Sequence, residues 1–263
     1  MPTNKTPPVR ISLEPEIQYK APLKLIPIIE DLLISTGAKK ASSREGEKTY
    51  YWDTKNFRLF RQGMECRGRS KNGGFRFDLK VATGSNPTAL PDKDGILWRY
   101  ELKAPSDEPR PDLKVFFDHV AVPELRERLR DVYSKEVEPK FVAIYDKTKF
   151  EREITVGGKT GLIEYSLQSG YIRTLNGRQR TRTMGIVDVE LRSGANEAHL
   201  QAKTELETLS HLGLVMLPRR KLIMGMDLIV SEQDGKAYER VLDTLSIHRN
   251  HRRQMREMTL ALA

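Results

Sequence analysis

The residues best suited to chemistry in this sequence are acidic and basic side chains that recur at every second position. The first such series is Glu14, Glu16, Gln18 and Lys20. Because successive side chains of a β-strand point to opposite sides, these residues share one face of a strand. The same spacing returns in later segments, which carry Arg67 and Arg69; Arg76, Asp78 and Lys80; Arg99, Glu101 and Lys103; Arg152; Glu164, Ser166 and Gln168; Asp188 and Glu190.

Taken singly, a strand of this kind is most often amphipathic, with its polar face in water. Several of them in one chain favour a polar cavity instead, because their charged faces mix carboxylates with Arg and Lys. That mixture suits a polyphosphate held with divalent cations. Carboxylate oxygens bind Mg²⁺ or Mn²⁺, the cation neutralises phosphate oxygens, and Arg and Lys bind the remaining oxygens. The pattern therefore indicates a phosphate-binding cavity built by strands.

Apolar alternation and turn signals predict the strands that position these residues. Strands are expected at residues 11–20, 48–53, 64–69, 75–81, 96–103, 141–149, 150–156, 161–167, 171–175 and 186–192. Apolar residues at helical spacing predict helices over 22–36 and 196–211, and 123–132 is predicted as a short charged helix. Two strand-rich halves, each followed by helix, favour an antiparallel sheet closed into a barrel over alternating βαβ units.

Composition and charge restrict the class of protein. The 263 residues are 38% hydrophobic and 31% charged, which is typical of a globular, soluble chain. The single cysteine, Cys66, excludes an internal disulfide and, with no His/Cys cluster around it, a zinc-finger site. No apolar run approaches the roughly 20 residues that span a bilayer, and the N-terminus lacks the apolar segment of a signal peptide. We therefore expect a cytoplasmic protein, and its net charge of +9 suggests an acidic partner.

In their order and spacing, these segments resemble the CYTH superfamily of triphosphate tunnel metalloenzymes. The N-terminal strand of that family carries Glu-x-Glu-x-Lys, which residues 14–20 resemble. The resemblance continues through residues 50–54, Leu59 and Gly63, 67–69, 78–80, 99–101, 164–170, 187–194, and Lys221 with Gly225, and it covers roughly residues 10–230. Residues 125–153 look closest to the bacterial inorganic triphosphatase branch, because they lack the His-Leu-Asp segment leading to a Gly-Phe-Glu pattern that marks the cyclase and thiamine-triphosphatase branches.

The resemblance implies an α+β fold that is mainly antiparallel β: an eight-stranded closed β-tunnel with helices packed outside it. The expected organisation is a flexible N-terminal tail over residues 1–9, a tunnel domain over 10–230, and a C-terminal helical extension over 231–263 packed on the same domain.

The function that the resemblance implies is that of a metal-dependent phosphohydrolase, a triphosphatase. It would bind the triphosphate of inorganic tripolyphosphate or of a nucleoside triphosphate in the tunnel and hydrolyse the terminal phosphate with Mg²⁺ or Mn²⁺. By position, the metal ligands would be Glu14, Glu16, Glu101, Glu164, Asp188 and Glu190. The phosphate-binding residues would be Arg67, Arg69, Lys80, Arg99, Arg152 and Lys221. The catalytic residues would be Lys20, which would orient the attacking water, and Glu16.

Three positions depart from the family pattern. Gln18, Gln168 and Lys103 stand where the family has acidic residues. A neutral amide is a poorer ligand for a hard cation than a carboxylate, so these changes weaken the case for a full two-metal site. They leave two alternatives open: a tunnel that binds polyphosphate or a phosphorylated ligand without turnover, and an adenylate cyclase of the CYTH type.

A small-molecule triphosphate or polyphosphate is therefore the expected partner of a monomer or homodimer, and neither a membrane nor nucleic acid is expected. The basic hairpin at residues 173–182 has no interleaved aromatic residues on which bases would stack. His248 and His251 have the spacing of a helical metal site but no third ligand, which favours a solvated helix face.

Overall fold

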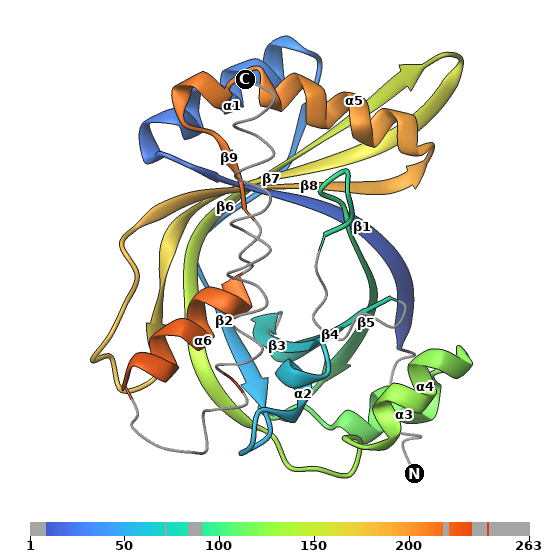
Figure 1. Ribbon diagram of the computed structural model, residues 1–263, viewed down its shortest axis with the longest axis vertical. Coiled ribbons are helices and arrows are strands. Elements are labelled where there is room, and N and C mark those ends of the chain that lie inside the picture. Colours follow the sequence, from blue (N-terminus) through green and yellow to red (C-terminus); the bar gives the residue numbers. More distant parts are fainter. Residues whose placement is uncertain (1–8, 72, 84–90, 218–220, 233–240, 242–263) are drawn as a thin grey trace.

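The computed structural model describes residues 9–71, 73–83, 91–217, 221–232 and 241 (Figure 1). Within them, eight antiparallel strands close into a barrel in the order β1-β5-β4-β3-β2-β6-β7-β8, with β8 pairing back to β1. The strands are β1 (Arg10–Ala21), β2 (Lys39–Asp53), β3 (Met64–Lys71), β4 (Gly74–Ala82), β5 (Leu97–Ser106), β6 (Glu138–Val156), β7 (Lys159–Thr174) and β8 (Met184–Gly194). A short strand, β9 (Val215–Met216), adds to β1. The expected α+β fold with a closed eight-stranded antiparallel tunnel is confirmed.

β1 closes the barrel because it pairs with two strands in succession. Its first half, up to Glu16, pairs with β5, and its second half, from Glu16 onward, pairs with β8. Glu16 therefore lies at the seam, opposite Leu97 on one side and Glu190 on the other.

Two groups of helices cover the outside of the barrel, and they lie at opposite ends of Figure 1. The first group is η1 (Leu23–Leu25), α1 (Ile26–Ser35), α5 (Asn196–Glu207) and η2 (Ser210–Leu212); the second includes α3 (Leu113–His119) and α4 (Pro123–Arg130). α1 and α5 cover an apolar cluster with Ile17, Tyr165 and Val189. α3 and α4 cover another with Leu79 and Leu102. Since the apolar face of these strands is buried outward, their charged face points inward.

α6 (Lys221–Glu232) occupies a different place, because it packs against side chains that point into the barrel. Its residues Ile223 and Met226 contact a cluster with Phe141, Ala143 and Tyr145 of β6. α2 (Arg58–Arg61) adds Phe60 to the same cluster. One end of the tunnel is thus filled by apolar side chains, and the charged side chains line the remainder.

The structure merges several predicted strands. The predicted pairs 141–149 with 150–156 and 161–167 with 171–175 are single strands, since the β6–β7 register runs without interruption from Phe141 to Val156. β2 begins at Lys39, before the predicted start, because its polar first half pairs with β6 without any apolar alternation. The predicted helix over 196–211 ends at Glu207 and is followed by η2, and α3 was not predicted.

Some predictions fall outside the described residues. Residues 1–8 of the predicted tail do so, as do residues 233–240 and 242–263 of the predicted helical extension, including His248 and His251. The predicted domain boundaries remain predictions. No helix in the described part of the chain is long and apolar enough to cross a membrane.

Candidate functional site

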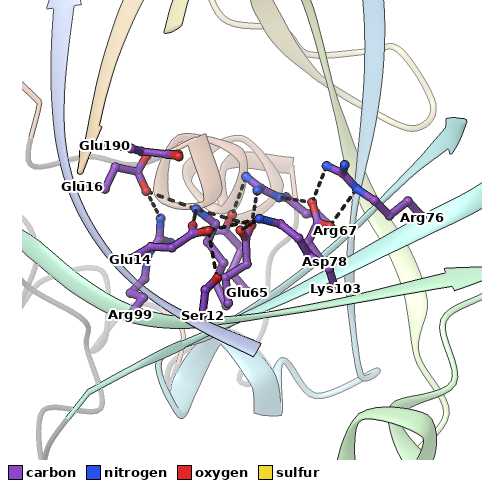
Figure 2. A network of polar contacts seen from close by, with 12 residues as sticks. Ser12, Glu14, Glu16, Glu65, Arg67, Arg76, Asp78, Arg99, Lys103 and Glu190 are labelled. Carbon is purple, nitrogen blue, oxygen red and sulfur yellow. Dashed lines mark hydrogen bonds and ion pairs between the residues drawn. The ribbon is translucent and has the colours of Figure 1, made fainter. Parts of the chain in front are cut away.

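The inner face of the barrel carries a network of buried acidic and basic side chains, which point toward one another in Figure 2. Glu16 is only 4% exposed and Arg99 only 2%. Burying a charged group without a partner is strongly unfavourable, so each of these groups needs an opposite charge nearby. The alternation of the strands supplies those partners from neighbouring positions.

Lys80 lies at the centre of the acidic side chains. Its Nζ is 3.3 Å from Glu14 Oε2, 3.2 Å from Glu16 Oε2 and 3.7 Å from Glu101 Oε1. Burial alone would lower the pKa of Lys80, but the carboxylates of Glu101 and Glu16 raise it above its ordinary value. The ammonium group is therefore charged at neutral pH.

Arginines complete the network on both sides of Lys80. Arg99 donates to Glu16 and, over 3.0 Å, to Glu65. Arg67 donates to Glu101 over 2.7 Å, and its Nε is 3.2 Å from Asp78. Because Asp78 is also contacted by Arg69 and Arg76, these guanidinium groups hold the pKa of Asp78 at about 2, below its ordinary value in spite of its burial.

A small cavity of about 30 Å³, partly open to solvent, lies beside this network. Its charged lining is Glu47, Arg67, Arg69, Lys147 and Lys221. The cavity therefore has an excess of positive charge, which attracts anions.

Lys147 is the least compensated of these cations. Its ammonium group makes no hydrogen bond or ion pair with a described residue, although the carboxylates of Asp188 and Glu47 are close enough to interact with its charge. Burial, followed by the neighbouring charges of Lys221 and Lys149, lowers the pKa of Lys147 to about 7. Lys221 reaches into the barrel from α6, where its Nζ is 2.6 Å from Gln168 Oε1 and 3.7 Å from Asp188 Oδ2.

Most of the predicted site residues come together on this inner face. They are Glu14, Glu16, Arg67, Arg69, Lys80, Arg99, Glu101, Glu164, Asp188 and Glu190 from the strands, and Lys221 from α6. The structure adds inner-face residues that were not assigned a role from the sequence, namely Glu47, Glu65, Lys147, Lys149 and Arg192.

The predicted phosphate-binding role of Arg152 is wrong in this geometry. Arg152 lies opposite Ile163, on the outer face of the barrel, and makes two hydrogen bonds of 2.7 and 2.9 Å to Glu205 of α5. The inner-face cations of β6 are Lys147 and Lys149, at odd-numbered positions. Alternation in the sequence did not identify them, because the apolar residues Phe141, Ala143 and Tyr145 have the same parity on this strand.

Lys20 does not join the network in this structure. It is exposed at the end of β1, and its side chain forms no hydrogen bond or ion pair with the described residues. Its catalytic role remains a prediction.

The acidic side chains do not fit a divalent metal ion as they are arranged. Glu16, Glu190 and Glu164 are neighbours in register across β1, β8 and β7. However, Glu190 is 3.1 Å from Arg192, and Glu164 is bound by Lys149. Throughout the described residues, no group of three or more Asp, Glu, His or Cys side chains could hold a metal ion.

Three buried oxygens near this row have no hydrogen-bond partner among the described residues. They are Oε1 of Gln18, Oδ1 of Asp188 and Oγ of Ser166, and they come from positions in register on β1, β8 and β7. Burial raises the pKa of Asp188, although Lys221 opposes this effect. With one carboxylate among three oxygens, this set is a weak donor set for Mg²⁺ or Mn²⁺.

Comparisons with known proteins find structural similarities with low TM-scores and low sequence identities. No protein-family profile matches the sequence, and no curated protein matches it. A candidate adenylate cyclase of Bacillus halodurans is 20% identical, with a TM-score of 0.43 over 81% of this chain and 97% of that chain. A Hippeastrum protein, described as a candidate adenylyl cyclase with a dominant triphosphatase activity, is 14% identical, with a TM-score of 0.48 over 85% of this chain and 98% of that chain.

A third similarity involves a chain of the Schizosaccharomyces pombe Mediator head module, which is 12% identical, with a TM-score of 0.39 over 78% of this chain and 98% of that chain. Because these identities and scores are low, the function of this chain is inferred from its own geometry. The membership in the CYTH superfamily and in its triphosphatase branch remains a prediction.

Proposed function

We propose that the barrel binds the triphosphate group of inorganic tripolyphosphate or of a nucleoside triphosphate. The observation that carries this proposal is the cavity lined by Arg69, Lys147 and Lys221, in which the ammonium group of Lys147 makes no ion pair with a described residue. The four cations of the lining exceed its one carboxylate, so an anion that enters the cavity balances their charge. A triphosphate brings several negative charges into one narrow space.

The arginines next to Lys147 extend this site toward the centre of the barrel. Arg67 lines the cavity and also donates to Glu101 and Asp78 in the ion-pair network. Guanidinium groups bind phosphate oxygens in the same two-pronged geometry as carboxylates. A phosphate chain in this cavity therefore has Arg67 and Arg69 within its walls as well as Lys147.

Hydrolysis of the terminal phosphate, by an Mg²⁺- or Mn²⁺-dependent triphosphatase, is the second candidate function. It is favoured by the unpartnered oxygens of Gln18, Asp188 and Ser166. These oxygens offer hydrogen bonds to a water molecule near Glu190, whose carboxylate is the type of proton acceptor that attack of water on phosphorus requires.

Isothermal titration calorimetry with tripolyphosphate, ATP and sulfate tests the proposal. We expect saturable binding of tripolyphosphate that is at least about tenfold tighter than that of sulfate. Absence of binding would contradict the proposal. Product analysis of the same mixtures with Mg²⁺ or Mn²⁺ then separates the activities. Release of phosphate identifies a triphosphatase, formation of pyrophosphate and cyclic AMP identifies a cyclase, and binding without products identifies a binding tunnel.

A further inference from the structure

Two carboxylates of the network, Glu14 on β1 and Glu101 on β5, are bridged by two ammonium groups. Lys103 Nζ is 3.1 Å from Glu14 Oε1 and also contacts Glu101 Oε2. Lys80 Nζ is 3.3 Å from Glu14 Oε2 and 3.7 Å from Glu101 Oε1. Figure 2 shows Lys103 and Glu14 within the network. Each oxygen of the two carboxylates therefore has an ammonium partner.

The carboxylates of this arrangement have cationic partners without any added ion. Besides the two ammonium groups, Arg67 donates to Glu101 over 2.7 Å and Arg192 lies 3.7 Å from Glu14, while Lys80 is shared with Glu16 at 3.2 Å. Glu101 is 2% exposed and Lys80 is 1% exposed. At such burial a carboxylate without a cationic partner would be strongly unfavourable, so the ammonium groups stabilise the buried carboxylates.

The same contacts oppose the entry of a metal ion. Mg²⁺ and Mn²⁺ bind through carboxylate oxygens, and the oxygens of Glu14 and Glu101 are already paired with cations. A divalent ion at this position would have to displace both ammonium groups and would then be repelled by them. Lys103 is suited to test this, because it contacts both carboxylates, so that one substitution there can exchange an ammonium group for a third carboxylate.

We infer that the ammonium groups of Lys80 and Lys103 are the resident counter-cation of the Glu14–Glu101 pair, so that triphosphate binding in this tunnel needs no divalent metal ion. This inference rests on the proposed function, that the tunnel binds a triphosphate.

The first experiment compares two conditions for the full wild-type chain. Tripolyphosphate is titrated calorimetrically in EDTA and again with Mg²⁺, at matched concentrations of free tripolyphosphate. We expect dissociation constants that agree within about twofold. Binding that is at least about tenfold weaker in EDTA would overturn the inference and leave the proposed function intact. Absence of binding in both conditions would overturn the proposed function and this inference with it.

The second experiment replaces Lys103 by an acidic residue. In Lys103→Glu, a third carboxylate joins Glu14 and Glu101 and one ammonium group is lost. We expect this variant to bind Mn²⁺ in the absence of phosphate, as measured by electron paramagnetic resonance, and to require Mn²⁺ for tripolyphosphate binding. Wild type should bind Mn²⁺ at least about tenfold more weakly than the variant. Equal Mn²⁺ affinity of the two proteins would overturn the inference.

Two control variants keep this test decisive. Lys103→Gln removes one ammonium group without adding a carboxylate, so its affinity for Mn²⁺ should lie between those of wild type and Lys103→Glu. Lys48→Glu makes the same charge change at an exposed position of β2 whose neighbours Glu47 and Thr49 line the cavity. It should behave as wild type in both measurements. If Lys103→Glu does not fold, as judged by circular dichroism, Mn²⁺ binding to wild type and to Lys103→Gln decides the inference, and binding to wild type that is as tight as binding to Lys103→Gln contradicts it.

Discussion

At the scale of single residues, the charge of Lys147 depends on pH near neutrality. Burial, with Lys221 and Lys149, lowers the pKa of Lys147 from 10.5 to about 7 in the folded protein. In the unfolded chain a lysine keeps its proton up to about pH 10.4. Between these two values the folded protein binds fewer protons than the unfolded chain, so this residue makes stability rise with pH in that window.

Replacing Lys147 should remove that dependence. We expect Lys147→Gln to raise the free energy of unfolding at pH 6 by about 1–2 kcal/mol. This value is smaller than the pKa shift alone would give, because water reaches part of the wild-type side chain. The gain should shrink as the pH rises toward 10, where wild-type Lys147 is neutral in the folded state. Urea unfolding at pH 6, 8 and 10 measures the difference, with Lys48→Gln as the control. A difference that does not change with pH would contradict the assigned titration.

At the scale of elements, Arg152 and Glu205 join β6 to α5 on the outside of the barrel. We expect Arg152→Ala to lower the free energy of unfolding by about 1 kcal/mol, since the ion pair is two-pronged but partly exposed. It should leave the affinity for tripolyphosphate unchanged within about twofold. Thermal unfolding and calorimetry measure the two effects. A loss of affinity without a loss of stability would indicate that Arg152 binds phosphate, which contradicts its assignment to the outer face.

Gly225 of α6 allows this helix to pack closely against β6. A Cβ at Gly225 would lie 2.2 Å from Cζ of Phe141, so any side chain there pushes the helix away from β6. We expect Gly225→Ala to lower the free energy of unfolding by about 1–3 kcal/mol. It should also weaken tripolyphosphate binding, because Lys221 reaches the cavity from this helix.

A compensating change tests the cause of that loss. Phe141→Leu in the Gly225→Ala background removes the ring that the added methyl group meets, and it should restore part of both the thermal stability and the affinity. An unchanged melting temperature in Gly225→Ala alone would mean that α6 is not held closely against Phe141.

At the scale of the whole molecule, the barrel turns its charged side chains inward and buries its apolar side chains outward under helices. α1 and α5 cover one part of the outer face, and α3 and α4 cover another. A tunnel lined in this way attracts ligands that match its charges along their length. A phosphate chain fits that description better than a compact anion.

The alternation of residues in the sequence predicted this inner face for β1, β3, β4, β5, β7 and β8, because on these strands one face is apolar and the other charged over the whole site. β6 could not be assigned in the same way. Its apolar residues Phe141 and Tyr145 point inward under α6, whereas Phe150 and Ile154 point outward under α1 and α5. The apolar face therefore changes sides along one strand, and only the tertiary positions of the helices determine where.

The pairing of charges inside the tunnel could not be predicted from the sequence either. Residue types and spacing placed Glu14, Lys80 and Glu101 on the inner face, but the distances between side chains of different strands depend on the barrel's register. That register brings Lys80 and Lys103 onto the carboxylates that the family pattern assigns to metal ions.

The most direct test of the account is the effect of Lys147→Gln on calorimetric binding of tripolyphosphate at pH 6, where Lys147 is charged, with Lys48→Gln measured beside it. Both variants lose one positive charge, but only Lys147 lines the cavity. We predict that Lys147→Gln weakens binding roughly tenfold to a hundredfold, as expected for a charge-assisted hydrogen bond, and that Lys48→Gln changes it by less than about twofold. Equal affinities of the two variants, or no saturable binding to wild type, would contradict the proposal that this tunnel is a triphosphate site.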